Sequence, residues 1–256
     1  MQTNKDNLVV LGAGWLGQAL CIDAQKQGWL VQGAHRSDTH QFDFERQFVL
    51  QNGELQHQVD LQNAYWVCAI PPRSRDSQSD YPQVLEQALK LATELNCKGF
   101  LLCSSTGVYD QEPGVYSESS DISGTNERQI KLYDAEEQVL EQQGKVLRLA
   151  GLLGPNREPG RFVAGKELNT SSKQVVNMVH QQDVINAIYA VLNNWSQGQS
   201  IYNVVNPAHP TKEDYYAQKC KLYGTQMPSF SSNEVAERKV IGSAIEALGF
   251  SYQYGI

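Results

Sequence analysis

Three glycines near the start of the chain have the spacing of a phosphate-binding turn. Gly12, Gly14 and Gly17 form the pattern G-x-G-x-x-G directly after the apolar run Leu8–Leu11. In this motif the first glycine permits a tight turn, the second lets a pyrophosphate approach the backbone, and the third lets a helix pack closely on the strand. The pattern favours a dinucleotide site over an ordinary strand-turn-helix with small residues at the crossing.

The backbone amides that follow this turn are the expected phosphate donors. Amides in the first turn of a helix lack partners within it and lie at the positive end of the helix dipole. We therefore expect the amides around Trp15 and Leu16 to face the phosphates.

The residues after the second predicted strand bear on the choice of nucleotide. In dinucleotide folds an acidic residue here holds the ribose 2′-hydroxyl, whereas an Arg accommodates a 2′-phosphate. The strand predicted over 30–34 is followed, after one residue, by Arg36 and Ser37, which can donate to a phosphate. We predict NADP(H) in preference to NAD(H). Asp38 as a ribose ligand and a solvated surface role for Arg36 both stay open.

Strand and helix patterns alternate through more than half of the chain. The predicted strands cover 8–11, 30–34, 54–59, 65–70, 99–103 and 145–149, and the predicted helices 15–27, 84–95 and 127–142. This order predicts an α/β fold with a Rossmann-type, doubly wound parallel sheet. Residues 39–52 show neither pattern clearly. Only residues 60–64 separate the third strand from the fourth, so the crossover helix is reduced to a turn or the third strand is misplaced.

The sequence pattern changes after the strand at 145–149. A loop is predicted over 154–161, strands over 175–179 and 200–205, a helix over 183–192, and a second helix that Thr211 caps and that ends near residue 222. We predict a dinucleotide-binding domain over 1–154. A smaller substrate lobe over 155–256 is partly interleaved with the main sheet.

Bulk composition excludes several classes of protein. The 256 residues carry a net charge of −7 without a block of Lys or Arg, which argues against a nucleic-acid partner. The longest apolar runs fall short of the roughly 20 residues of a membrane span, and the first residues show no signal-peptide pattern. The five cysteines contain no C-x-x-C pair. These features predict a cytoplasmic, reduced protein that binds no membrane and no metal.

Motifs farther along the chain occur in a recognisable order. They are L-C-S-S-T-G-V-Y over 102–109, L-R-L-A-G-L-L-G-P over 147–155, N-M-V-H-Q-Q-D-V over 177–184 and Y-N-V-V-N over 202–206. Together with the glycine turn, their order and spacing resemble the extended short-chain dehydrogenase/reductases, the NAD-dependent epimerase/dehydratase family. The resemblance covers nearly the whole chain. It implies a nicotinamide cofactor and a small carbonyl or hydroxyl substrate, such as a nucleotide sugar.

The chain departs from this family at its catalytic pair. The family carries a Y-x-x-x-K pair about two dozen residues after the V-Y dipeptide. Aligning on residues 135–137 puts Arg128 and Leu132 at the two positions, and a shift by one residue gives Gln129 and Tyr133. Neither register supplies Tyr followed by Lys, so the chain resembles an atypical branch that lacks the pair.

Serines and a tyrosine after the fifth predicted strand are the candidate catalytic residues. The resemblance assigns Ser105 to the substrate oxygen. The position of Ser104 and Ser105 over the crevice of such a fold favours contact with the nicotinamide or the substrate, whereas strand-end serines can also satisfy backbone groups. Tyr109 is a candidate proton donor, and its alternative is an aromatic side chain packed under the loop. We place Ile70 and Pro71 in the cofactor site because the fold leads the chain past the cofactor there. Arg73 and Arg75, which come next, either approach a phosphate or an acidic substrate or are surface charges on a loop.

Other side chains are weaker candidates for the missing proton donor. Tyr133 is expected to pack on a helix face. Lys166 and Arg161 either meet an anionic substrate or form a solvated pair. His180 and Asp183 have spacing that favours capping of a helix over proton transfer.

These observations predict an NAD(P)-dependent oxidoreductase or an epimerase/dehydratase-like enzyme. The absence of the Tyr-Lys pair leaves two alternatives, namely a catalytically silent NADP(H)-binding sensor and an assembly subunit with a structural nucleotide. A homodimer through the helices over 84–95 and 127–142 is expected because relatives commonly pair through these faces.

Overall fold

The computed structural model describes residues 6–37, 41–72, 79–232 and 237–256. The chain forms two compact units that are interleaved in sequence. The first unit contains Met1–Val108, Gly124–Arg148 and Asn194–Ile201, and the second contains Tyr109–Ser123, Leu149–Asn193 and Tyr202–Ile256.

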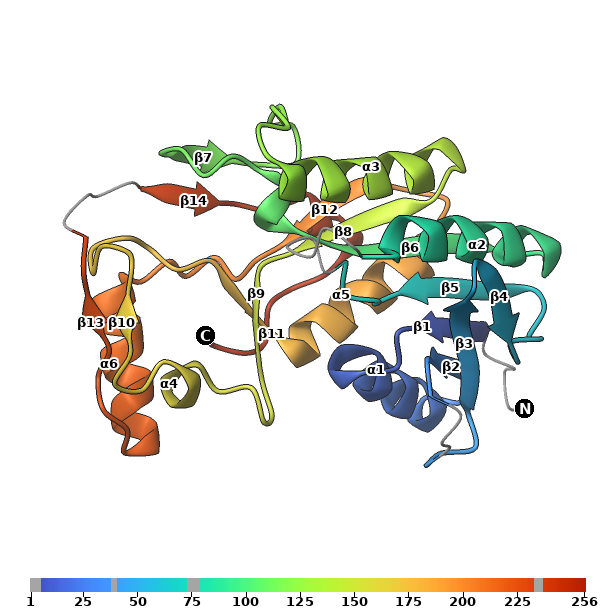
Figure 1. Cartoon of the computed structure of the whole chain (residues 1–256), viewed down its shortest axis with the longest axis horizontal. Helices are drawn as coiled ribbons and strands as arrows, with labels where there is room; N and C mark the ends of the chain where they lie inside the picture. The colour runs from blue at the N-terminus through green and yellow to red at the C-terminus, as the bar shows by residue number, and fades with distance from the viewer. Residues whose placement is uncertain (1–5, 38–40, 73–78, 233–236) are drawn as a thin grey trace. The chain divides into compact units, whose positions relative to one another are not determined.

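One sheet of eight strands dominates the described structure (Figure 1). Its order is β12-β8-β6-β5-β1-β2-β3-β4. The strands are β1 (Asn7–Leu11), β2 (Leu30–His35), β3 (Glu45–Gln51), β4 (Glu54–His57), β5 (Ala64–Cys68), β6 (Gly99–Ser105), β8 (Lys145–Leu149) and β12 (Ile201–Val204). Strand β1 pairs in parallel with β2 on one side and with β5 on the other. The strand order therefore reverses beside β1, which confirms the predicted doubly wound α/β fold and identifies its switch point.

Helices cover both faces of the sheet in the first unit. In Figure 1, α1 (Trp15–Lys26) lies on one side, while α2 (Tyr81–Glu94) and α3 (Glu127–Glu141) lie on the other. Buried apolar side chains from the sheet, α2 and α3 form one core, among them Trp66, Leu85, Leu102 and Val139. These contacts anchor the strands of the sheet to the two helices on one of its faces.

The third strand was predicted in the wrong place. Strand β3 pairs in parallel with β2 and lies within the segment that showed no clear pattern, whereas β4 returns antiparallel to β3. Asn52 and Gly53 connect the two strands with φ angles of 54° and 83°. An Asn-Gly pair with positive φ is the usual connection of a tight hairpin. The strand expected at 54–59 is therefore the outer strand of this hairpin, and the chain reaches β5 without a crossover helix.

In its described residues, the second unit contains short parallel strand pairs and three α-helices. The pairs join β7 (Gly114–Tyr116) with β14 (Arg238–Val240), β9 (Gly151–Leu153) with β11 (Met178–His180), and β10 (Glu167–Leu168) with β13 (Ser229–Phe230). The helices are α4 (Pro159–Phe162), α5 (Gln181–Asn193) and α6 (Lys212–Tyr223). The part of the chain that the structure describes also holds the 3-10 turns η1 (Thr106–Val108) and η2 (Ala244–Leu248). The Thr211 side chain accepts from the Asp214 amide, which confirms the predicted cap of α6. The predicted loop over 154–161 was wrong in part, because α4 begins within it.

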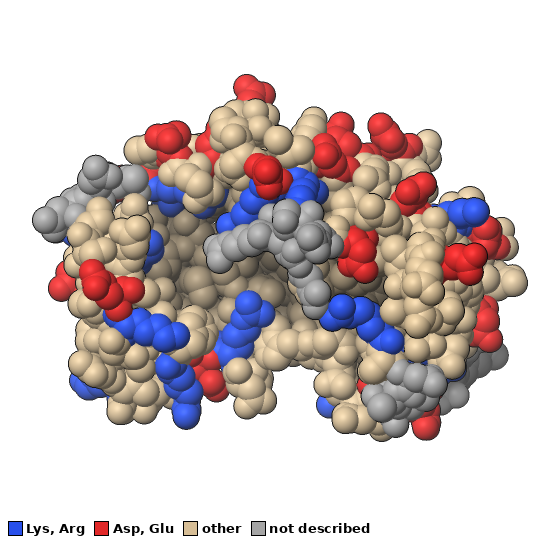
Figure 2. Space-filling model, in the orientation of Figure 1, with Lys and Arg blue, Asp and Glu red and all other residues tan. Residues whose placement is uncertain are grey.

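Charged side chains on the surface follow the acidic composition. Figure 2 shows Asp and Glu side chains over the region of α2 and α3. In the described residues, every helix is too short or too polar to cross a lipid bilayer. The homodimer predicted through α2 and α3 stays a prediction.

Candidate functional site

The glycine turn joins the end of β1 to the start of α1. Gly12 has a φ of +85°, and a Cβ atom there would lie 2.6 Å from the backbone nitrogen of Ile70. A Cβ atom at Gly17 would lie 2.3 Å from the carbonyl oxygen of Gly12. The tight turn at Gly12 and the close helix packing at Gly17 are therefore confirmed, since any larger residue would collide with backbone at either place.

The first turn of α1 is open to a ligand in the described structure. Gly14 is the N-cap residue, no side chain caps the helix, and the first turn holds no acidic residue. A Cβ atom at Gly14 would meet no atom within 4 Å. The helix places Trp15 and Leu16 directly after this opening. The arrangement suits an anionic group, because backbone donors and the positive end of the helix dipole face the same space.

A pocket of about 180 Å³ lies beside the turn. It brings together five of the predicted cofactor residues: Gly12, Gly14, Arg36, Ile70 and Pro71. The Ser37 hydroxyl instead lies 2.9 Å from Nδ1 of His35, and Asp38, Arg73 and Arg75 fall outside the described residues.

Sequence reasoning missed several residues that line this pocket. Ser79 and Asp80 directly precede α2, Tyr81 and Val84 belong to its first turn, and residues 48–50 come from β3. Tyr81 was missed because α2 begins three residues before the predicted start. The β3 residues were missed because the strand was not recognised, although the Asn52-Gly53 pair that follows it is a hairpin signal. The cofactor assignments stay predictions, and the residues present fit a dinucleotide.

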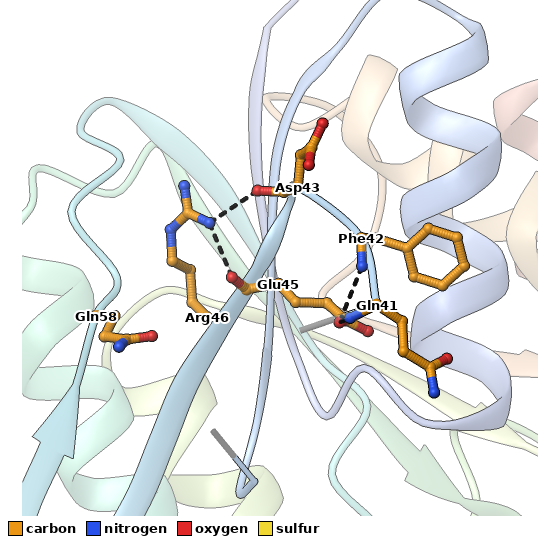
Figure 3. Close-up of a pocket in the computed structure, with 6 residues that line it drawn as sticks. All are labelled: Gln41, Phe42, Asp43, Glu45, Arg46 and Gln58. Carbon is orange, nitrogen blue, oxygen red and sulfur yellow. Dashed lines mark hydrogen bonds between the residues drawn. The ribbon is translucent and has the colours of Figure 1, made fainter. Parts of the chain in front are cut away.

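A second pocket, of about 420 Å³, lies at the start of β3 (Figure 3). The buried carboxylate of Glu45 accepts from the backbone amides of Gln41 and Phe42, and Arg46 donates to the carbonyl oxygens of Asp43 and Glu45. These groups hold the segment that follows Arg36 and Ser37. We interpret these contacts as local support for the start of β3.

Consecutive serines at the end of β6 lie in different environments. Ser104 is 6% exposed, and its hydroxyl donates to Oε1 of Glu136 at 2.5 Å. Ser105 is half-buried, and its Oγ accepts from the Gly107 amide at 3.0 Å. Alternate residues of a strand point to opposite faces, so the two hydroxyls cannot share a role. The bond from Ser104 to Glu136 favours the structural interpretation of Ser104, while Ser105 keeps a proton to donate.

An ion pair lies buried beneath the end of β6. Arg148 donates to Oε2 of Glu136 from Nε at 2.9 Å and from Nη2 at 2.7 Å, and the side chains are 3% and 1% exposed. Burial raises the pKa of the Glu136 carboxyl, while Arg148 and the Ser104 hydroxyl oppose this shift. The pair joins α3 to β8 and supports the strand end that carries Ser105.

The positions of the missing catalytic pair lie in the first two turns of α3. Arg128 and Leu132 occupy one register; Leu132 is buried, whereas Arg128 is partly exposed. In the other register, Gln129 is buried and its Oε1 accepts from Thr125 and Asn126, while Tyr133 is 39% exposed. The buried Leu132 and Gln129 are both committed to packing or to local hydrogen bonds.

Tyr109 belongs to the second unit and is fully buried. Its hydroxyl donates to Oδ1 of Asn203 at 2.8 Å, and its ring lies 5.6 Å from the ring of Tyr116. These contacts favour the packing interpretation over the role of a proton donor.

The remaining candidates also lie in the second unit. Nδ1 of His180 accepts from the Gln182 amide at 3.1 Å, which agrees with capping of α5. Asp183 instead accepts from the amides of Gln253 and Tyr254 and holds the C-terminal segment. Lys166 is exposed.

A pocket of about 380 Å³ in the second unit is lined by several polar and aromatic side chains. They include Arg157, His180, Lys219, Tyr223 and Tyr254. The rings of His180 and Tyr254 stack at 4.5 Å, and burial lowers the pKa of His180. No cluster of three or more potential metal ligands occurs in the described residues.

Comparison with known proteins identifies both a relative and the fold. No family model matches the chain. Protein YeeZ of Escherichia coli K12 is 31% identical over 265 residues, which cover 96% of each chain. MoeE5 in complex with UDP-glucose and NAD superposes with a TM-score of 0.78 at 17% identity, covering 98% of this chain and 94% of MoeE5. UDP-glucuronic acid 4-epimerase from Bacillus cereus in complex with NAD gives 0.75 at 16% identity, covering 97% and 92%.

These matches agree with the resemblance seen in the sequence motifs. The structural neighbours share the doubly wound sheet, and their names state that they bind NAD and act on or bind UDP-sugars. The chain belongs to the same family as YeeZ and has the fold of the extended short-chain dehydrogenase/reductases.

Proposed function

We propose that this chain binds a nicotinamide dinucleotide along the glycine turn and prefers NADP(H) to NAD(H). The pocket that joins the Gly12–Gly14 turn to Arg36 supports this proposal most strongly. Arg36 follows β2, where a guanidinium can bind the 2′-phosphate that distinguishes the two cofactors. The two described residues that follow β2, Arg36 and Ser37, are not acidic, while Asp38 lies outside the described residues.

We further propose an oxidoreductase or epimerase/dehydratase-like reaction on a small carbonyl or hydroxyl substrate. The bound nicotinamide would supply hydride transfer. Ser105 ends β6, which is two strands from β1 in the sheet. Neighbouring strands are about 4.8 Å apart, so the hydroxyl lies on the order of 10 Å from the glycine turn, within the span of an extended dinucleotide. Ser105 would donate to the substrate oxygen. The UDP-sugars of the structural neighbours support a nucleotide sugar as the substrate.

Calorimetric titration with NADPH and NADH tests the cofactor proposal. Gly14→Ala adds a methyl group to open space, so the fold is retained while the approach of the phosphates is blocked. We expect both cofactors to bind at least about 10-fold more weakly, because charge-assisted hydrogen bonds are lost. Gly114→Ala, whose added methyl group meets only the ring of Tyr116 at ordinary contact distance, serves as the control.

Arg36→Ala tests the choice between the cofactors. We expect a loss of about 10- to 100-fold in affinity for NADPH and little change for NADH, because a charged hydrogen bond contributes about 1.5–3 kcal/mol. Equal losses for both cofactors would contradict the preference for NADP(H).

A catalytically silent redox sensor is the second candidate. It is favoured by the absence of Tyr followed by Lys at the two positions of α3. Steady oxidation of NADPH with any member of a panel of carbonyl compounds and UDP-sugars would exclude the sensor. Tight binding that distinguishes NADP⁺ from NADPH, without turnover of any compound in the panel, would exclude the enzyme.

A further inference from the structure

The pocket of about 380 Å³ in the second unit brings together residues from separate parts of the chain. His180 ends β11, Lys219 and Tyr223 belong to α6, and Tyr254 lies near the C-terminus. Lys219 and Tyr223 have the i, i+4 spacing of residues on one face of a helix. The volume falls within the range of small-ligand pockets, about 300–1,000 Å³.

Hydrogen bonds and ring stacking hold two of these side chains in place. Nδ1 of His180 accepts from the Gln182 amide at 3.1 Å, so the proton of the neutral ring lies on Nε2. The Asp183 carboxylate accepts from the amides of Gln253 and Tyr254 at 2.9 and 3.2 Å, and the ring of Tyr254 stacks on that of His180. His180 therefore offers one fixed donor, Nε2–H, to a ligand in the pocket.

Lys219 brings a positive charge to the same pocket. Its ammonium group lies 5.6 Å from the centre of the Tyr215 ring, and none of the ion pairs among the described residues includes it. Burial lowers the pKa of His180, Asp183 opposes this shift, and the charge of Lys219 adds to it. The ammonium group thus acts on the imidazole, and the two side chains can reach one bound anion.

Two further charged side chains line the pocket. Glu158 has a cationic partner, because Nε of Arg161 lies 3.8 Å from its Oε2. Arg161 also lies 5.0 Å from the centre of the Tyr223 ring and packs against it. Arg157 already has an interaction within the protein, so the site does not depend on it.

The chemistry of the pocket suits a small acid that carries hydroxyl groups. One ammonium group and one neutral N–H match a single carboxylate better than a phosphate dianion. The tyrosines combine an apolar ring with a polar hydroxyl, which suits a ligand that has both C–H groups and hydroxyls. Tyr254 is 44% exposed, so its side chain is accessible to such a ligand.

We propose that His180 and Lys219 bind the carboxylate of a sugar acid in this pocket. The ammonium group and Nε2–H donate to the carboxylate oxygens, and the sugar ring packs against Tyr254. Because the imidazole and the Tyr254 backbone are already held by hydrogen bonds, little ordering is needed when the ligand binds. This inference concerns the second unit and does not rest on the proposed function.

An NMR titration of the cofactor-free protein with three related sugars tests the site. D-glucuronate, D-glucuronamide and D-glucose 6-phosphate share their ring and carry a carboxylate, a neutral amide or a phosphate at the same end. We expect glucuronate to bind at millimolar concentration and glucuronamide at least about 10-fold more weakly, because a charge-assisted hydrogen bond is lost. Bound glucuronate should also raise the pKa of His180, because a nearby negative charge favours the protonated ring. Acetate, which has no ring, should bind more weakly than glucuronate.

Three variants separate the contributions. Lys219→Met removes the charge, and His180→Asn removes Nε2 while keeping an acceptor close to the Gln182 amide. Each should weaken glucuronate binding at least about 10-fold. Lys221→Met removes an exposed charge from the same helix and should bind glucuronate as the parent does. The NMR spectra show whether each variant is folded.

Several results would overturn the proposed site. They are no saturable binding of glucuronate at millimolar concentration, equal binding by the parent and Lys219→Met, and binding of glucuronamide, glucose 6-phosphate or acetate as tight as that of glucuronate. Failure of the proposed function gives a different result. If no nicotinamide cofactor binds while glucuronate binding still depends on Lys219, the cofactor proposal fails and the sugar-acid site stands.

Discussion

Two helices of the first unit, α1 and α3, pack on strands of the same sheet, and their N-cap residues differ. At α1 the N-cap is Gly14, which has no side chain to cap the helix. At α3 the N-cap is Asn126, whose Oδ1 accepts from the Gln129 amide at 3.0 Å. The first turn of α1 has no side-chain cap, whereas one amide in the first turn of α3 is bound by the Asn126 side chain.

The same two regions also differ in what holds them together. Around β1 and α1, backbone atoms approach so closely that glycine is required at Gly12 and Gly17. Beneath the end of β6, the ion pair of Glu136 and Arg148 joins α3 to the sheet. The glycine turn depends on the absence of side chains, and the β6 region depends on a specific pair of them. Mutations should separate these two kinds of stabilisation.

The largest effect is expected from breaking the buried ion pair. Arg148→Met leaves the Glu136 carboxylate without its charged partner, and we expect a loss of about 3–5 kcal/mol in the free energy of unfolding. Urea denaturation measures this loss. The double variant Glu136→Leu/Arg148→Met should recover most of it, because no lone buried charge remains. A cost below about 1 kcal/mol for the single variant would contradict the importance of the pair.

A smaller loss of stability is expected at the glycine turn, together with a loss of binding. Gly12→Ala places a Cβ atom against the backbone of Ile70 at a positive φ. We expect the free energy of unfolding to fall by about 2–3 kcal/mol. Affinity for the cofactor should fall in parallel. Gly14→Ala should lower the affinity for the cofactor while the free energy of unfolding stays close to that of the parent. Equal losses of stability in the two variants would contradict the close contact between Gly12 and the backbone of Ile70.

The smallest effect is expected from removing the cap of α3. Asn126→Ala loses the hydrogen bond to the Gln129 amide, and we expect a cost of about 1 kcal/mol in urea denaturation. Asn126→Asp retains an acceptor at the same place and should stay close to the parent. If Asn126→Ala weakened NADPH binding as much as it destabilised the fold, the two helix starts would not be independent.

Local patterns predicted most of the sheet, and they failed where the pattern was weak. The strands β1 and β5 lie close to their predicted positions because apolar runs mark buried parallel strands, and β2 and β8 also lie close to theirs. Strand β3 was missed because polar residues lie along much of it, with Phe48 as a buried residue between partly exposed neighbours. The Asn52-Gly53 hairpin signal was present in the sequence and was overlooked.

The candidate site divides in the same way. The glycine turn was predictable because its glycines lie in one short segment and their spacing determines the geometry. Arg36 was predictable because it directly follows the second strand of the dinucleotide fold. The cluster of Ser104, Glu136 and Arg148 was not, since its members come from segments far apart in the chain.

The sequence alone determined the alternating fold and the glycine turn, and it showed that the family's Tyr-Lys pair is missing. These properties depend on residues within one strand-turn-helix unit or on the identity of single positions. The tertiary structure alone decided which serine of β6 faces inward and which residue of α3 lies beside Ser105. The physical reason is that side-chain partners are set by the packing of α3 on the sheet, and neither register of an alignment determines that packing.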